Sequence, residues 1–280
     1  MCTKTTPSAL PRPSIPDSLA RLIERCRDAD RQPPFSDGTL VQLRSGEKQL
    51  LERDGAAAVY STTEAEFVVD PAVRGKGIGT GVLDEILEKS DPTVKIWAHG
   101  DHPAARALAA SHGFAPVRRL LQLRAPVDPN SAVETPAVQT PADTFRPGVD
   151  DAAWLKLNSR AFAFHPEQGL VSKADLEELM REPWFDAEDF LVLRDGDALI
   201  GFCWLKVEEP VGEFYVVGVD PERQGEGLGR RLMYAGFARL AARGIRIAAL
   251  YVESDNAAAV ALYRSLGFND HSVDIQYARA

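Results

Sequence analysis

Apolar and polar positions alternate along the second half of the chain in a pattern that predicts helices and strands in a regular order. Apolar residues at helical spacing predict helices over 154–163, 173–180, 228–243 and 256–266. Segments rich in β-branched and aromatic residues predict strands over 190–193, 198–205, 214–219, 247–252 and 273–278, with a hairpin turn at Asp195-Gly196. This order indicates an α/β fold (an α+β mixed sheet) with helices on the faces of the sheet.

The first half repeats two landmarks of the second half. Residues 69–79 match residues 219–229 at an offset of 150, and residues 112–114 match residues 266–268 at an offset of 154. Because the landmarks keep their order and spacing, two copies of one fold are expected. Residues 125–147 hold five prolines and no apolar periodicity, which is typical of an extended linker. We therefore expect a disordered tail over 1–16, a first domain over 17–125, a linker over 126–144 and a second domain over 145–280.

Composition and charge narrow the class of protein. Apolar residues make up 45% and charged residues 26% of the chain, which excludes a fully disordered protein. The formal charge of −9 disfavours nucleic-acid binding. No apolar run approaches the ~20 residues that cross a bilayer. Three scattered cysteines and five histidines show no metal-ligand spacing, so no metal is expected. These features predict a cytoplasmic monomer that acts on a small molecule.

A glycine-rich turn is the most informative local pattern. Residues 223–229 read Arg-Gln-Gly-Glu-Gly-Leu-Gly, after a predicted strand and at the start of a predicted helix. Glycines let backbone amides approach a ligand closely, and the first amides of a helix lack partners within the helix. Both properties favour a pyrophosphate cradle over a plain tight connection. The cradle is favoured further because the turn occurs twice.

The residues around this turn resemble a known signature. Val219-Asp220-Pro221-x-x-Gln224-Gly225-x-Gly227-x-Gly229, followed by Asn256 through Phe268, is similar to the GNAT acetyltransferase motif. The resemblance implies two tandem GNAT acetyltransferase-like domains, acetyl-CoA as cosubstrate with up to one molecule per domain, and a strand bulge near 217–219. The cofactor contacts that it implies are Phe67, Val68, Val69, Gly75, Lys76, Gly77, Ile78, Gly79, Thr80, Val217, Gly218, Val219, Gln224, Gly225, Glu226, Gly227, Leu228, Gly229, Arg230, Asn256, Ala257, Ala258, Ala259, Val260 and Ala261.

The same resemblance assigns proton transfer to the second half only. It implies Glu213 as the general base and Tyr263 as the general acid, although an exposed strand-end carboxylate and a core tyrosine are the alternatives. The repeat offsets place Thr63 and Ala109 at the matching positions of the first half. Alanine has no proton to give, so the first half is expected to bind CoA without catalysing transfer.

Local strings at 164–169, 201–206, 212–219 and 250–256 resemble a two-copy branch of this family. The acceptor of that branch is the cysteinyl amine of a cysteine–glucosamine–inositol conjugate. The resemblance implies substrate contacts from Glu167, Lys206, Glu213 and Tyr251, and from Asp37 in the first half, where a simple turn aspartate is equally consistent. Two other functions stay open: acetylation of another amine, such as an aminoglycoside or a protein N-terminus, and non-catalytic binding of acyl-CoA.

Overall fold

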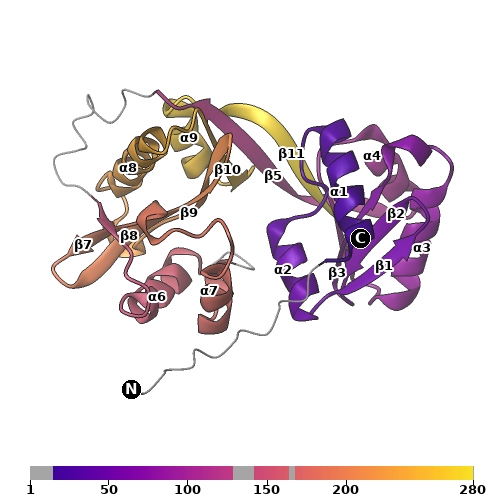
Figure 1. The fold of residues 1–280 in the computed structure, drawn as a ribbon, viewed down its shortest axis with the longest axis horizontal. Helices are drawn as coiled ribbons and strands as arrows, with labels where there is room; N and C mark the ends of the chain where they lie inside the picture. The colour runs from indigo at the N-terminus through magenta and orange to yellow at the C-terminus, as the bar shows by residue number, and fades with distance from the viewer. Residues whose placement is uncertain (1–14, 129–141, 164–167, 280) are drawn as a thin grey trace, which may run out of the picture. The chain divides into compact units, whose positions relative to one another are not determined.

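The structure is a computed structural model that describes residues 15–128, 142–163 and 168–279 (Figure 1). Most of the expected tail and linker, and Glu167, therefore lie outside the described residues. Contacts divide the chain into two compact units. The first unit contains the described residues up to Leu120 together with those from Ser272 onward, and the second contains Leu121–His271.

The first unit is a five-stranded sheet with helices on both faces. Its strands lie in the order β1-β2-β3-β4-β11, with β3 parallel to β4 and the other neighbours antiparallel. One face packs α1 and Phe35, and the other packs α3 and α4. The elements are α1 (Asp17–Asp30), α2 (Asp37–Ser45), β1 (Gln49–Arg53), β2 (Ala56–Tyr60), β3 (Glu64–Val69), α3 (Ile78–Lys89), β4 (Lys95–Ala98), α4 (Pro103–Ser111), β5 (Phe114–Pro126) and β11 (Asn269–Arg279).

The second unit repeats this plan, with β5 at one edge of its sheet. Its strands lie in the order β5-β10-β9-β8-β7-β6, and β9 and β10 form the parallel pair. The elements are β6 (Asp143–Thr144), α6 (Asp151–Ala161), α7 (Lys173–Leu179), β7 (Phe190–Asp195), β8 (Ala198–Glu208), β9 (Val211–Val219), α8 (Leu228–Ala242), β10 (Ile247–Glu253) and α9 (Ala257–Ser265). These bounds confirm the predicted mixed sheet and the predicted order of its elements.

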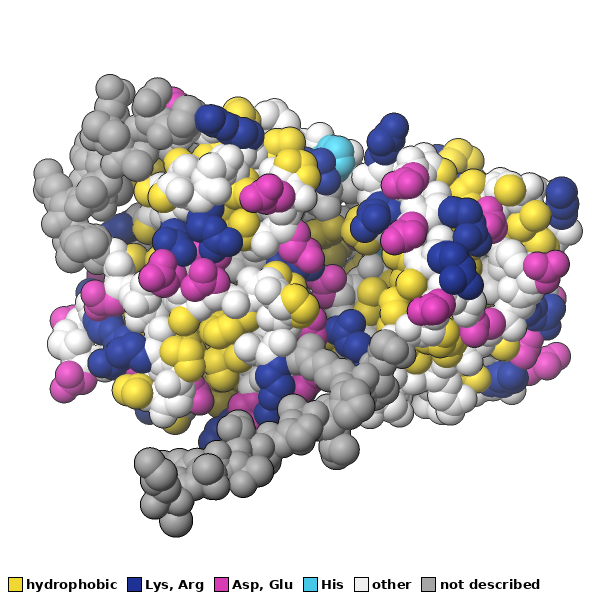
Figure 2. All heavy atoms as spheres, viewed as in Figure 1, with side chains coloured by type: hydrophobic (Ala, Val, Ile, Leu, Met, Phe, Trp, Pro, Cys, Tyr) yellow, Lys and Arg dark blue, Asp and Glu magenta, His cyan; other side chains and the backbone are white. Residues whose placement is uncertain are grey.

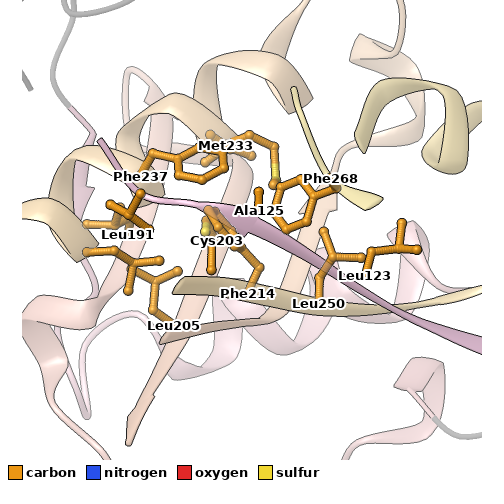
Figure 3. Packing of buried hydrophobic residues seen from close by; sticks show 14 of the residues in the cluster. Leu123, Ala125, Leu191, Cys203, Leu205, Phe214, Met233, Phe237, Leu250 and Phe268 are labelled. Atoms are coloured by element: carbon orange, nitrogen blue, oxygen red, sulfur yellow. The ribbon is translucent and has the colours of Figure 1, made fainter. Parts of the chain in front are cut away.

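Two apolar clusters hold the second sheet between its helices. The cluster on the α8 face contains Cys203, Phe214, Met233 and Phe268, whose side chains point toward one another in Figure 3. The cluster on the α6 and α7 face is aromatic, and the indole of Trp154 meets the rings of Phe190, Phe202 and Trp204 edge-on. Burial of such rings is the main favourable contribution to folding of this unit.

The closing strands do not follow the boundaries of the sequence repeat. Ile275–Tyr277 of β11 pair with β4, so the last strand of the second copy completes the sheet of the first unit. The end of β5 instead packs into the second unit, where Leu123 and Ala125 are buried in the α8-side cluster. The expected linker also overlaps ordered structure, because Val127 is buried and 143–144 pair with β7. Apolar side chains at these positions gain by joining a core.

The strand bulge lies earlier in β9 than the sequence predicted. Trp204 faces Val216 and Leu205 faces Phe214, so Tyr215 is the extra residue and the prediction of a bulge at 217–219 was wrong. The bulge reverses the alternation of β9, since Phe214 and Val216 then enter opposite clusters. In the first unit the β2–β3 register runs without a shift from Ala56↔Val69 to Tyr60↔Ala65.

The surface carries charges of both signs. On the face drawn in Figure 2, acidic and basic side chains alternate over both units, and no broad basic patch gathers there. Within the described ranges, no helix combines the length and apolar character that a membrane span requires.

Candidate active site

Both glycine turns have the geometry of an anion cradle. Gly75, Gly77, Gly225 and Gly227 have φ between 75° and 86°, a region that side chains other than glycine rarely adopt. A Cβ at any of them would meet nothing within 4 Å, so the space above each turn is open. The first main-chain hydrogen bond of α8 is donated by Arg231 N to Gly227 O. The three amides before Arg231 therefore have no partner within the helix. Such amides favour phosphate oxygens.

The parallel strands beside each turn separate, and this opens a slot. In the second unit, β9 and β10 pair from Val211↔Ile247 to Phe214↔Leu250, although β9 continues to Val219. In the first unit, β3 and β4 pair only as far as Glu66↔Trp97, although β3 continues to Val69. Backbone groups beyond the last pair are available to an extended ligand such as a pantetheine arm.

In the first unit this slot is a cavity of about 380 Å³. It runs from the glycine turn to Trp97 and His99, and its walls are mainly apolar, as in most small-molecule sites. Ala109, the counterpart of Tyr263, lies in its wall. Of the residues expected at this cofactor site, all but Lys76 line the cavity: Phe67, Val68, Val69, Gly75, Gly77, Ile78, Gly79 and Thr80.

His99, in the wall of the first cavity, belongs to a charged triad. His99 lies between two carboxylates, with Nε2 3.1 Å from Glu66 Oε2 and Nδ1 3.0 Å from Asp274 Oδ2. Burial opposes ionisation of His99, but Glu66 and Asp274 outweigh it and raise the pKa of His99 to about 10. Burial would likewise raise the pKa of Glu66, yet His99 and the donors of Ser36 hold it at about 2. His99 is therefore an imidazolium whose nitrogens are both occupied.

In the second unit, Tyr263 lies on α9 at the margin of the apolar core. Its ring packs edge-on against Phe268 at 6.0 Å, and it borders the cluster that contains Cys203. Burial, with a smaller contribution from Cys203, raises the pKa of Tyr263 to about 12. The phenol is thus protonated at neutral pH. Cys203 is fully buried and burial raises the pKa of its thiol as well, so it is not a nucleophile.

The expected acceptor residues of the second unit share one face of the sheet. Glu213 of β9 is paired with Lys206 of β8 on one side and with Ala249 of β10 on the other. The Lys206 ammonium bonds Glu208 at 2.8 Å and lies 5.7 Å from the centre of the Trp184 ring. Tyr251, two residues after Ala249 on the same strand, also lies on this face because successive side chains alternate.

Other residues that were expected to contact the cofactor or the acceptor lie at or near the starts of helices. Asn256 caps α9 by accepting a hydrogen bond from Ala259 N at 3.2 Å, and residues 257–261 form the exposed or half-buried first turns of that helix. Arg230 bonds Ser265 Oγ at 2.9 Å. Asp37 is the exposed first residue of α2, directly after the cap Ser36. Residues 217–219, 224, 226, 228 and 229 lie in or beside the second glycine turn, as the motif requires.

Sequence reasoning missed several polar groups. It did not single out Glu66, His99 and Asp274, nor Gln122, whose Nε2 donates to the Tyr251 hydroxyl at 2.5 Å. A polar residue inside an otherwise apolar strand was the available signal: Gln122 and Arg124 alternate with Leu121, Leu123 and Ala125 in the printed sequence.

Comparison with known proteins agrees with this geometry. The model of the acetyltransferase (GNAT) family matches residues 49–114 and 153–268. A solved GCN5-related N-acetyltransferase from Sphaerobacter thermophilus has a TM-score of 0.67 at 23% identity, over 94% of this chain and 91% of that one. A tandem GNAT protein from the clavulanic acid biosynthesis pathway has a TM-score of 0.62 at 17% identity, over 92% of this chain and 94% of that one.

The chain belongs to the GNAT acetyltransferase family, and it is an acyltransferase enzyme built from two GNAT regions. GNAT acetyltransferases use acetyl-CoA as the acetyl donor. More particularly, the chain is similar along nearly its whole length to proteins named mycothiol acetyltransferase. The relative from Kocuria rhizophila is 44% identical over 94% of this chain and 95% of its own length, and that from Clavibacter michiganensis subsp. michiganensis is 45% identical over 96% and 93%.

Proposed function

We propose that this enzyme transfers the acetyl group of acetyl-CoA to the cysteinyl amine of a cysteine–glucosamine–inositol conjugate, giving mycothiol and CoA. The name of its relatives supports this acceptor. The observation that carries the proposal is the asymmetry of the two units. Both have the glycine turn, but among the described residues only the second combines a buried, protonated tyrosine on α9 with Lys206, Glu213 and Tyr251 on one sheet face.

The reaction needs a neutral amine, and in this proposal Glu213 accepts its proton. The amine nitrogen bonds to the thioester carbonyl carbon, Glu213 takes the amine proton, and the carbon–sulfur bond breaks with its electron pair passing to sulfur. The Tyr263 hydroxyl donates a hydrogen bond to that sulfur and keeps its own proton. The CoA thiolate then takes a proton from solvent and Glu213 releases the amine proton to solvent, so the overall reaction conserves charge.

The raised pKa of Tyr263 defines how it acts as the general acid. Complete proton transfer from a phenol of pKa about 12 to a thiolate of ordinary pKa near 8.5 is uphill by about 5 kcal/mol. Tyr263 therefore lowers the barrier chiefly as a hydrogen-bond donor to the sulfur while negative charge develops there. A residue in this role must stay protonated, which burial ensures.

We propose further that the first unit binds acetyl-CoA without transferring its acetyl group. Its cavity fits the cosubstrate because a glycine turn, separated strands and apolar walls meet in it. Two carboxylates of β3 are occupied: Glu66 accepts from Ser36, Thr39 and His99, and Glu64 accepts from Lys48 and Trp97. Ala109 stands at the position of Tyr263, so the first cavity lacks the hydroxyl that this proposal assigns to Tyr263.

A mass-spectrometric assay tests the proposed reaction. The protein and acetyl-CoA are incubated with the cysteine–glucosamine–inositol conjugate and, separately, with an aminoglycoside and a peptide that has a free N-terminus. The gain of one acetyl group on the conjugate, with slower reaction of the other amines, is the expected result. Faster acetylation of either other amine would replace the proposed acceptor.

A further inference from the structure

The strand β5 presents two polar side chains on the acceptor face of the second unit. Leu123 and Ala125 point into the α8-side cluster in Figure 3, so Gln122 and Arg124, which alternate with them, lie on the opposite face. Tyr251 lies between two buried residues of the same cluster, so its side chain is also on that opposite face. The hydrogen bond from Gln122 Nε2 to the Tyr251 hydroxyl shows the two side chains meeting there.

The register of β5 against β10 brings Arg124 level with Glu213, the expected general base. Val127 N donates to Arg246 O at 2.9 Å, and Gln122 meets Tyr251, so the two strands run antiparallel with Arg124 facing Ala249. Ala249 is paired in turn with Glu213. At the usual spacing of strands, Arg124 and Glu213 have their backbones about 10 Å apart, with only a methyl group between them.

Both side chains keep hydrogen-bonding atoms without a partner among the described residues. Gln122 is 5% exposed, and its Oε1 accepts nothing there. Arg124 Nε is buried and has no acceptor there. Burial lowers the pKa of Arg124, and the one opposing contribution comes from Tyr251, not from a carboxylate. Buried polar atoms without partners are costly, so a ligand that supplies donors and acceptors would gain by binding here.

We propose that Gln122 and Arg124 are part of the acceptor site and bind the hydroxyl groups of its sugar portion. This inference rests on the proposed function. With the amine at Glu213, an acceptor that extends across Ala249 brings its ring hydroxyls to β5. Arg124 offers donors to hydroxyl oxygens, and Gln122 Oε1 accepts from a hydroxyl hydrogen. The two residues thereby select acceptors that carry a hydroxyl-rich ring over acceptors that carry the amine alone.

Two acceptors with the same reacting amine test this selection. The first is the complete cysteine–glucosamine–inositol conjugate, and the second is cysteinamide, which lacks both rings. Arg124→Met and Gln122→Met keep most of the side-chain volume and remove the polar groups. For each variant we expect kcat/KM for the conjugate to fall about 10-fold or more, through KM, while kcat/KM for cysteinamide and KM for acetyl-CoA stay within about twofold.

The matched control is Arg246→Met, a change of an exposed arginine that directly precedes β10. It should leave both acceptors unaffected. An equal fall for both acceptors, or no fall for the conjugate, would overturn the role of Gln122 and Arg124. A wild-type protein that acetylates neither acceptor would instead overturn the proposed function. Binding of glucosaminyl-inositol, which cannot react, gives a second measurement: its Kd should rise about 10-fold in Arg124→Met and stay unchanged in Arg246→Met.

Discussion

At the scale of single residues, the two units differ in which groups can move a proton. Burial keeps Tyr263 protonated beside the core of the second unit, whereas Ala109 offers only a methyl group in the first. In the first unit, the imidazole of His99 is fixed between Glu66 and Asp274. The residue type alone therefore does not determine whether a group can transfer a proton, because this also depends on burial and on neighbouring charges.

Replacing Tyr263 with phenylalanine tests its role directly. Tyr263→Phe keeps the edge-on packing against Phe268 and removes the hydroxyl. We expect kcat to fall roughly 100-fold, as is usual when a positioned proton donor is lost, with little change in KM for acetyl-CoA. Steady-state kinetics measures both constants, and thermal unfolding checks that the fold is intact. A variant that keeps its kcat would show that Tyr263 is a packing residue.

The pH dependence of kcat should also reflect the protonation state of Tyr263. The pKa of Tyr263 is raised to about 12, so its deprotonation cannot cause a loss of kcat between pH 8 and 10. We expect wild type and Tyr263→Phe to have the same profile over that range apart from a constant factor. A decline of the wild-type profile in that range that the variant lacks would contradict this.

His99 gives a prediction about stability. Its folded pKa of about 10 lies above the ordinary 6.5, so its contribution is complete below pH 6.5 and is lost as the pH rises toward 10. Histidine NMR resonances should show His99 still protonated at pH 8, with assignment by His99→Gln. Chemical denaturation of the first unit should show lower stability at pH 10 than at pH 6.5. Titration of His99 near pH 6.5 would rule out the buried triad.

Some of these residues could be found from the sequence and others could not. The resemblance to the GNAT motif pointed to Glu213 and Tyr263. The triad escaped notice because its members are 33 and 175 residues apart and meet only through tertiary pairing. Gln122 and Tyr251 are likewise brought together by strand pairing, which local patterns do not specify.

At the scale of elements, hydrophobic periodicity predicted the helices and strands well, because each buries one face or one stripe. The bulge at Tyr215 was misplaced, since it depends on how two strands align and not on the residues of β9 alone. The turns were predictable for the opposite reason: the positive φ values of Gly77 and Gly227 are a local requirement that the sequence shows directly.

The paired turns allow a matched test of the two units. Gly77→Ala and Gly227→Ala each force alanine into a left-handed backbone, at a cost of about 1–2 kcal/mol in the affected turn. A Cβ has free space at both positions, so the effect should stay local. We expect Gly227→Ala to raise KM for acetyl-CoA and Gly77→Ala to leave turnover nearly unchanged.

Calorimetry completes this comparison. Acetyl-CoA should bind the wild-type protein at two sites. Gly77→Ala should weaken binding at the site of the first unit, and Gly227→Ala at the site of the second. Equal loss of turnover in Gly77→Ala and Gly227→Ala would show that the first unit takes part in catalysis.

At the scale of the whole molecule, the internal repeat was readable from the sequence, but the division into compact units was not. The segment 273–278 is an apolar strand that could join either sheet, and it joins the first through the pairing of Ile275, Gln276 and Tyr277 with β4. The shorter connection along the chain favoured the sheet of the second unit. The longer connection costs only a slowly growing loop-closure entropy, which strand pairing and the Asp274–His99 contact outweigh.

A truncation tests this assignment. A chain ending at His271 lacks Asp274 and the edge strand beside β4, and it leaves Glu66 and His99 without their third partner. We expect the first unit to lose protection in hydrogen exchange along β4 and α1, while α8 and β9 of the second unit keep theirs. Loss of protection in the second unit alone would contradict the pairing.

The pairing of β11 with β4 also has a consequence for synthesis. A ribosome releases the helices and four strands of the first unit long before it reaches residue 272. Until then, the edge of β4 stays open, and Glu66 and His99 lack Asp274, so the first unit of the nascent chain stays incomplete until residues 272–279 are made. The unit that is made first is therefore completed only after the second unit has been synthesised.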